Sequence, residues 1–498
     1  MKQPLLRTAV TSLWFNRKDA FYQVIIVAIL AAIICGSLLT GDSVRRSLAK
    51  SLSEKLGNSD LLISSGTRYF RASVSKRISD KTGSEAVAIL ENDGFCRNFA
   101  TGKTALHIKI YGIENDFFYF HHLDMNAPPA GEVFINEQLS RTIGAGEGDE
   151  IIVNFTEVDP IPSNAPFAPS GGNENSKVLK ISKVLTGSLG GNFSLGASQL
   201  IPLNIFTNTI DLESSEKDEK KANRLLIHNS SGRSDSSFIK TLEAILTPSD
   251  IGLSMRISAK TGEAELLSDR IFIDNELAGE IARNTPGARP VITYLANSIT
   301  SSGKKTPYSF ISALPPDMSG VKGKDEILIN KWLADDLDAK PGDSLKITWF
   351  DPGMGKRLEE KIMKFVISNI AGSNYIYSDP SLMPDFPGIS GSTTCSVWDA
   401  GVPILLDNIR DKDEKYWNLY RGTPKAFINY ETGKLLWGNN FGSATAFRYC
   451  KGADTSFIVN KLTGHINPLK AGFSLINLRA KNSDAAMNGV DFSTLFIS

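Results

Sequence analysis

The feature that most constrains this chain is an uncharged stretch near its N-terminus. No Asp, Glu, Lys or Arg occurs between Asp19 and Asp42. At about 1.5 Å per residue these roughly 22 positions span about 33 Å as a helix, which matches the hydrocarbon core of a bilayer. A secretory signal peptide has a shorter apolar region and a small-residue cleavage site, and this stretch has neither. We therefore predict a transmembrane helix over residues 19–41, with the lipid bilayer as its partner.

The N-terminal flank, residues 1–18, predicts an interfacial amphipathic helix because its apolar residues recur at helical spacing. Trp14 and Phe15 suit the headgroup level, and Arg17 and Lys18 suit the cytoplasmic edge. An ordinary basic flank is the alternative interpretation. Because long domains translocate largely regardless of their charge, we predict a cytoplasmic N-terminus and an extracytoplasmic bulk.

A second helical pattern follows the uncharged stretch. Apolar residues recur every four positions, and Gly57 supplies a helix stop; the stripe comprises Val44, Leu48, Leu52 and Leu56. We predict a stalk helix over residues 42–57 that continues the transmembrane helix out of the membrane. Such a stalk could transmit displacement to an outer domain, and the alternative is a helix that only packs on that domain.

Composition excludes one class of partner. The 54 basic and 54 acidic residues cancel, so no overall positive field favours nucleic acid, and we predict no nucleic-acid partner. With 41% hydrophobic and 22% charged residues, the rest of the chain has the composition of ordinary globular domains. The four cysteines have no metal-binding spacing, and a disulfide between Cys395 and Cys450 is left open.

An internal repeat indicates how the outer part is organised. Residues 132–149 (EVFINEQLSRTIGAGEGD) and 326–343 (EILINKWLADDLDAKPGD) align without gaps, with seven of 18 positions identical. Each copy reads as strand, N-cap asparagine, short helix, Gly-Asp turn and second strand, with the caps at Asn136 and Asn330. Two copies are too few for a solenoid and favour two related modules of an α+β fold.

The predicted boundaries follow from this repeat and from composition. Residues 58–211 form the first extracytoplasmic α+β module, 212–222 a charged linker, and 223–486 the second α+β region. The Pro-, Ser- and Asn-rich residues 160–177 predict a surface excursion. Residues 377–395 predict an ordered, packed loop rather than a catalytic lid.

No motif indicates catalysis. Residues 100–106 (ATGKTAL) suggest a phosphate-binding loop, but Arg97 stands where that loop needs glycine, and a hairpin turn is the better interpretation. The pair His121–His122 is unsuited to chelation because adjacent side chains point to different faces. Asp335–Asp336 is interpreted as solvated charge on a short helix. We assign no catalytic, cofactor-binding or metal-binding residues and predict that the chain is not an enzyme.

Several segments together resemble a known family, the FtsX-like, MacB-type ABC transporter permeases of bacteria. These segments span nearly the whole chain and include TSLWFNRKDAF (11–21), GDSVRRSL (41–48), LGGNFSLGASQLIPLNIF (189–206), ELLSDRIFIDNELA (265–278) and the two repeat copies. The resemblance implies a permease of the bacterial cytoplasmic (inner) membrane, with a MacB-like periplasmic domain after its first helix. It further implies a homodimer or permease heterodimer that works with a cytoplasmic ATP-binding ABC subunit.

One departure from the family pattern bears on function. Residues 487–498 read as the approach to a second transmembrane helix that this sequence does not contain. We therefore expect a permease subunit, or its N-terminal fragment, that couples ATP hydrolysis by a separate subunit to handling of a lipophilic, lipoprotein or peptide cargo. The alternative is a single-span, membrane-tethered binding or sensory module without an ATPase partner.

Overall fold

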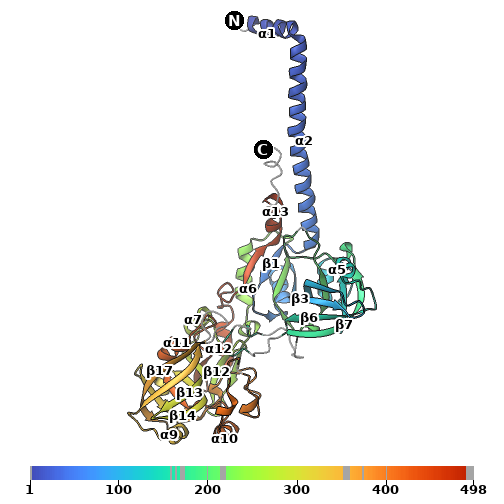
Figure 1. Ribbon diagram of the computed structural model, residues 1–498. Helices are drawn as coiled ribbons and strands as arrows, with labels where there is room; N and C mark the ends of the chain where they lie inside the picture. Colours follow the sequence, from blue (N-terminus) through green and yellow to red (C-terminus); the bar gives the residue numbers. More distant parts are fainter. Residues whose placement is uncertain are drawn as a thin grey trace.

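The computed structural model describes residues 3–156, 160–162, 165–168, 174–198, 200–213, 220–351, 359–372, 375–399 and 401–488. Helix α1 (Gln3–Phe15) turns sharply away from the long helix α2 (Arg17–Leu56) at Asn16 (Figure 1). Helix α2 runs unbroken through Gly36 and Gly41, so the predicted stalk continues the apolar segment as one helix. Within the described residues, α2 is the one helix long and apolar enough to cross a membrane, and its apolar window is fully unburied.

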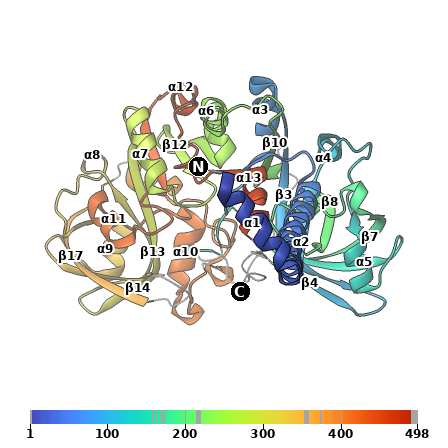
Figure 2. The ribbon, with the colours of Figure 1, turned by 90° about the horizontal axis from the view of Figure 1, so that it is seen from above.

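The rest of the described chain forms two strand-rich modules (Figures 1 and 2). Module 1 is built on a nine-stranded sheet: β1 (Leu61–Ser64), β3 (Glu85–Asn98), β4 (Thr104–Ile113), β5 (Glu132–Asn136), β6 (Glu150–Thr156), β7 (Glu174–Leu185), β8 (Asn204–Asn208), β10 (Arg224–His228) and β20 (Ser474–Asn477). Its helices are α3 (Val74–Thr82), α4 (Asn115–Phe120), α5 (Glu137–Ile143), α6 (Asp235–Ile245) and α13 (Leu478–Asn488). A two-stranded sheet joins β2 (Phe70–Arg71) to β9 (Lys221–Ala222).

Module 2 is built on a second nine-stranded sheet: β11 (Leu253–Ile257), β12 (Glu263–Ser268), β13 (Arg289–Ser301), β14 (Lys304–Leu314), β15 (Glu326–Ile329), β16 (Ser344–Asp351), β17 (Glu359–Ile370), β18 (Ala426–Asn429) and β19 (Ala446–Lys451). Its helices are α7 (Asn275–Asn284), α8 (Pro316–Ser319), α9 (Lys331–Leu337), α10 (Asp411–Tyr420), α11 (Tyr430–Trp437) and α12 (Thr455–Leu462).

The two sheets have the same strand order, which extends the 18-residue repeat to whole modules. Module 1 has the order β20-β1-β10-β3-β4-β8-β5-β7-β6, and module 2 has β11-β12-β19-β13-β14-β18-β15-β17-β16. In each, the last strand also pairs with the fourth, β6 with β3 and β16 with β13, which closes six strands into a barrel. Even the strand irregularity recurs, after Val133 in β5 and after Ile327 in β15. The predicted α+β fold with two related modules is therefore confirmed.

The repeated turn chemistry explains why both copies fold alike. The side chain of Asn136 accepts a hydrogen bond from Leu139 N, and that of Asn330 accepts one from Leu333 N, so both predicted N-caps are present. At the Gly-Asp turns, Gly148 has φ 92° and Gly342 has φ 96°, a conformation that favours glycine.

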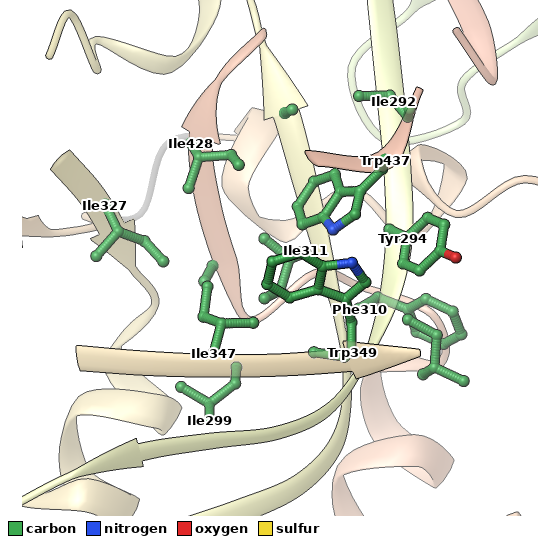
Figure 3. Packing of buried hydrophobic residues seen from close by; sticks show 14 of the residues in the cluster. Ile292, Tyr294, Ile299, Phe310, Ile311, Ile327, Ile347, Trp349, Ile428 and Trp437 are labelled. Carbon is green, nitrogen blue, oxygen red and sulfur yellow. The ribbon is translucent and has the colours of Figure 1, made fainter. Parts of the chain in front are cut away.

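The barrel of module 2 holds a large aromatic core. Tyr294 stacks on Trp437 with ring centroids 5.5 Å apart, and Trp349 meets the same indole edge-on at 6.5 Å (Figure 3). Phe167 joins this core from outside the module, because its ring lies 4.7 Å from that of Tyr294. Of the residues predicted as a surface excursion, 174–177 belong to β7. Residues 160–162 and 165–168 are not a surface excursion either, because Ile161, Ala165, Phe167 and Ala168 are buried in the core of module 2.

The module boundaries also differ from the prediction. Strands β10 and β20 belong to module 1 although both lie within residues 223–486. The residues of the predicted linker 212–222 that the structure describes belong there too, since Leu212 is buried in the barrel core and β9 pairs with β2. Pairing between strands that are distant in sequence leaves no local pattern, so composition alone misplaces these boundaries.

Two helices connect a strand of one module to a strand of the other. Helix α6 connects β10 of module 1 to β11, the edge strand of module 2, and α12 connects β19 of module 2 to β20, the edge strand of module 1. Together with α3 and α7, these helices line one side of the molecule (Figure 2) and share one hydrophobic cluster with both sheets. The two modules therefore share a continuous core.

Candidate functional site

Helix α2 ends inside module 1 rather than on its surface. The stripe predicted for the stalk divides: Val44 is 41% exposed and Leu48 half-buried, whereas Leu52 and Leu56 are buried. Leu56 lies in a cluster with the outer face of the module 1 sheet and the phenylalanines of α4. A displacement of α2 therefore acts directly on the core of the module.

The chain turns at Gly57 in a way that only glycine allows. Its φ is 53°, and a Cβ there would lie 2.3 Å from Nδ1 of His121. The backbone N–H of Asn58 donates to that same Nδ1 at 3.2 Å, and Nδ2 of Asn58 donates to the carbonyl of Phe120 at 2.8 Å. His121 is thus the hydrogen-bond acceptor that fixes the end of the stalk.

The surroundings of His121 keep it neutral. Its ring packs against those of Phe117, Phe120 and Phe193, with centroids 4.7, 5.0 and 5.2 Å away. Burial, with a smaller contribution from the charges of His122 and Arg479, lowers the pKa of His121 to about 4. A neutral ring leaves Nδ1 free to accept from Asn58, so the side chain acts as a structural cap.

Helix α13 returns to the same place and clamps the last turn of α2 (Figure 1). The guanidinium of Arg479 donates to the carbonyl of Ser53 at 3.2 Å, to the carbonyl of Gly57, and to Oδ1 of Asp60 at 2.9 Å. Nδ2 of Asn482 donates to the carbonyl of Leu52 at 3.2 Å. The bonds to Ser53 and Gly57 satisfy carbonyls at the end of α2 that the helix itself leaves without partners. Together with the bond to Leu52 they join α2 to α13.

Asp60 anchors this clamp from below. Its Oδ2 meets Nδ1 of His228 at 2.8 Å and accepts from Asn229 N at 2.8 Å. Although burial opposes it, these hydrogen bonds and the one from Arg479 lower the pKa of Asp60. The carboxylate therefore stays ionised and holds α13 against module 1.

On its other side, the stalk holds the connection between β7 and β8, residues 186–203. Nζ of Lys55 donates to the carbonyls of Ser198 and Leu200, both at 2.9 Å. The Lys55 side chain is buried, and this burial lowers its pKa. We call Lys55–Asp60, His121, residues 186–203 and the two α13 side chains Arg479 and Asn482 the stalk joint.

The same connection forms one wall of an open groove in module 1. The groove holds about 1020 Å³ and lies on the outer face of the sheet. Glu91, Lys109 and Arg224 lie on its floor, and Leu106, Leu200 and Ile201 lie among the apolar residues of its walls. Lys55 therefore links the position of the stalk to the wall of a cavity large enough for a ligand.

Residues singled out in the sequence occupy structural positions. Residues 101–102 make the predicted hairpin turn between β3 and β4. Asp335 is exposed, but Asp336 is not solvated charge as predicted: its side chain is 2% exposed and binds Arg410, Lys412 and Thr306. Among the described residues, no cluster of His, Cys, Asp and Glu side chains is placed to hold a metal ion.

The described loop at 377–395 packs as predicted, with Leu382, Phe386 and Ile389 buried. Cys395 is buried, Cys450 is exposed, and both are free thiols, so the disulfide left open by the sequence does not form. Residues 487–498 are the predicted approach to a second membrane helix. Residues 489–498 of this segment lie outside the described residues. Sequence reasoning missed Lys55 and Arg479, since a single basic residue in a solvated region has no distinguishing local signal.

The His121 cap predicts a pH-dependent stability. Because the folded-state pKa lies below the unfolded value of about 6.5, the unfolded chain binds more protons between about pH 4 and 6.5. The free energy of unfolding of the full chain in detergent should therefore fall by about 2 to 3 kcal/mol as the pH is lowered from about 6.5 to about 4. Chemical denaturation at a series of pH values measures this change. His121→Gln should flatten this slope, whereas replacing the exposed His465 should not. Equal slopes in both variants would contradict the assignment.

Comparisons with known proteins find partial likenesses to solved structures. No protein-family model and no curated protein matches the chain. The periplasmic region of MacB from Actinobacillus actinomycetemcomitans is 12% identical with a TM-score of 0.26, over 38% of this chain and 86% of that one. A domain assigned to a permease protein from Porphyromonas gingivalis is 13% identical with a TM-score of 0.21, over 40% of this chain and 74% of that one. Both likenesses are low in identity and partial in coverage, and they carry no argument about this chain.

Proposed function

We propose that this chain is a permease subunit of an ABC-type transporter, or the N-terminal part of one. In this proposal α2 crosses the bacterial cytoplasmic membrane with the N-terminus inside, and α1 lies at the membrane interface. A separate cytoplasmic subunit hydrolyses ATP, and the chain itself performs no catalysis. Two permease chains, identical or different, work together on a lipophilic, lipoprotein or peptide cargo.

The observation that carries the proposal is the unbroken path from the apolar segment into the module core. Helix α2 is 40 residues long and ends with Leu56 fully buried. An anchor that only tethers a domain needs no such rigidity, and a flexible linker would serve. A continuous helix instead transmits axial movement and rotation, because every turn is hydrogen-bonded to the next.

The return of α13 to the stalk supports the same function. Helix α13 leaves the stalk joint beside α2 and points toward the same end of the molecule (Figure 1). Movement of either helix relative to the other would strain the bonds from Arg479 and Asn482. The joint is therefore suited to sense relative movement of two membrane-proximal segments, as an ATP-driven permease requires.

A membrane-tethered binding or sensory module is the second candidate, and the groove favours it. An open cavity of about 1020 Å³ in module 1 serves ligand capture without any ATPase. The two candidates differ in one respect. A permease subunit co-purifies with an ATP-binding subunit from native membranes, and a tethered module does not.

The coupling proposal predicts the effect of breaking α2 above the joint. Leu48 is half-buried in the exposed part of the stalk, so Leu48→Pro should kink the helix, at a local cost of about 3 kcal/mol, without removing the anchor. In the complex purified with its ATP-binding subunit and returned to liposomes, ATP-dependent cargo handling should fall at least about tenfold while membrane association is retained. Leu48→Ala keeps the helix and is the matched control. Full activity of the proline variant, or absence of any ATP-binding subunit, would refute coupling and leave the tethered module.

A further inference from the structure

Module 2 fills the outer face of its sheet with a segment of its own chain. In the β17–β18 connection, residues Asp379–Leu382 lie across the strands. Oδ2 of Asp379 meets Nη2 of the fully buried Arg448 at 2.8 Å. The same carboxylate accepts from Oγ of Ser258 at 2.8 Å. Leu382 is 3% exposed and lies in a hydrophobic cluster. An acidic residue followed three positions later by an aliphatic one thus docks on this face.

Backbone contacts hold the same segment along the sheet. Nη2 of Arg256 donates to the carbonyl of Ser381 at 2.9 Å, and Oγ1 of Thr293 donates to the carbonyl of Leu382 at 2.7 Å. Glu265 also accepts a hydrogen bond from Oγ of Ser381 at 2.9 Å. The side chains that hold the segment therefore come from four neighbouring strands: Arg256 from β11, Glu265 from β12, Arg448 from β19 and Thr293 from β13. The sheet face therefore recognises a short peptide through one carboxylate, two carbonyls and one apolar side chain.

The groove of module 1 lies on the corresponding strands. In strand order, β20, β1, β10, β3 and β4 match β11, β12, β19, β13 and β14. The first four contribute to the floor, with Ile476 from β20, Ser64 from β1, Arg224 from β10 and Glu91 from β3. Both faces point away from the helices α3, α6, α7 and α12. The alternate residues of these strands point toward those helices and belong to the shared hydrophobic cluster.

Module 1 leaves this face partly open because its connection is shorter. The β7–β8 connection spans residues 186–203, whereas β17–β18 spans residues 371–425. Phe193 and Leu195 cover part of the face and pack with α4. Beyond them the floor remains accessible, and three neighbouring wall residues expose large apolar surface: Leu106 60%, Leu200 80% and Ile201 48%.

The floor of the groove carries charged side chains that pair with one another. Nε of Arg224 donates to Oε2 of Glu91 at 2.6 Å, and Nζ of Lys109 lies 3.2 Å from Oε1 of the same carboxylate. Nζ of Lys109 also lies 2.7 Å from Oδ1 of Asp93, so the two cations face two carboxylates.

Arg224 lies on β10, the strand that corresponds to β19 of module 2. On β19, Arg448 binds Asp379 although it also pairs with Glu263 and Glu265, so a paired arginine at this place still accepts a further carboxylate.

An acyl chain of a lipid would displace the water around the ion pairs on the floor and form no hydrogen bonds in its place. Burying the charged side chains in this way is unfavourable. A peptide with a carboxylate and backbone carbonyls replaces the hydrogen bonds of that water.

We propose that the groove of module 1 binds a peptide segment of a partner protein, with an acidic residue followed within about three positions by an aliphatic one. The acidic side chain meets Arg224 and Lys109, and the aliphatic side chain packs against Leu106 and Leu200. The segment would occupy module 1 as residues 379–382 occupy module 2. The inference does not rest on ATP coupling, so binding without any ATPase subunit tests it separately from the proposed function.

The test uses the full chain in phospholipid nanodiscs and a fluorescein-labelled peptide of residues 378–383, SDPSLM. Fluorescence polarisation should show saturable binding that weakens with salt. The peptide with Asp changed to Asn should bind at least about fivefold more weakly, because it loses the charge-assisted hydrogen bonds.

Two variants of one exposed wall residue keep the test independent of folding. Leu106→Asp adds a repelling charge and should weaken binding about tenfold, whereas Leu106→Lys should retain it. Arg224→Gln should weaken binding to a similar extent, with Arg283→Gln in α7 of module 2 as the matched control. No saturable binding, or equal binding of the Asp and Asn peptides, would overturn the proposal. Photo-crosslinking from position 106 to nanodisc lipid in place of the peptide would assign the groove to lipid and would also overturn it.

Discussion

Replacing Ile29 and Ile33 together by arginine should prevent stable membrane insertion of this chain. Both side chains lie in the middle of the apolar part of α2 and are exposed, at 55% and 61%, with no protein surface to shield a charge. A central arginine costs about 2.5 to 3.5 kcal/mol on insertion scales, so two cost about 5 to 7 kcal/mol. Carbonate extraction of cell membranes measures the effect, and the variant should appear in the soluble fraction.

The matched control replaces the same two residues by leucine, which keeps the apolar surface and the helix propensity. This control should remain in the carbonate-resistant pellet. If the double arginine variant stays there too, α2 does not cross the membrane, and the stalk would need another anchor. The result therefore decides the first step of the proposed function before any ATPase is considered.

The second large effect is expected for Arg448→Met. The guanidinium is fully buried and pairs with two nearly inaccessible carboxylates, Glu265 and Asp379, and with Glu263 at 3.1 Å. Removing the cation leaves these charges buried without compensation, which costs about 3 to 5 kcal/mol. Chemical unfolding of the full chain in detergent, followed by circular dichroism, should show this loss.

A neighbouring arginine supplies the control for this variant. Arg256 also pairs with Glu265, at 2.7 Å, but its side chain is 39% exposed, so Arg256→Met should cost about 1 kcal/mol or less. Adding Glu265→Gln to Arg448→Met should recover part of the stability, because a neutral amide is cheaper to bury than an unpaired carboxylate. Equal losses for the two single variants would contradict the assigned role of Arg448.

Local patterns were enough to predict much of this fold. The uncharged stretch and the four-residue stripe predict one long helix, and α2 runs unbroken to Leu56. The repeated asparagines predict two helix N-caps, and both side chains accept the expected backbone hydrogen bond. These features depend on residues within one or two turns of each other, where spacing alone carries the information.

Features that depend on distant pairing could not be predicted. The placement of β20 beside β1 joins residues more than 400 positions apart, as the pair Leu61 and Asn477 shows. Phe167 is buried in the other module although its neighbours in sequence read as a polar loop. The stalk joint belongs to the same class, since Lys55 and Arg479 acquire their roles only from the carbonyls that the fold brings to them.

The two helices that connect the modules have a mechanical consequence. A domain joined to its neighbour by a single connecting segment can rotate about that segment. A domain joined by two separate connecting segments has less freedom to rotate and moves together with its neighbour. Helices α6 and α12 are two such connections, and both lie on the same side of the molecule. A small tilt of the stalk would therefore move both modules together through their shared core. The displacement would be largest at the end of module 2 that lies farthest from the stalk.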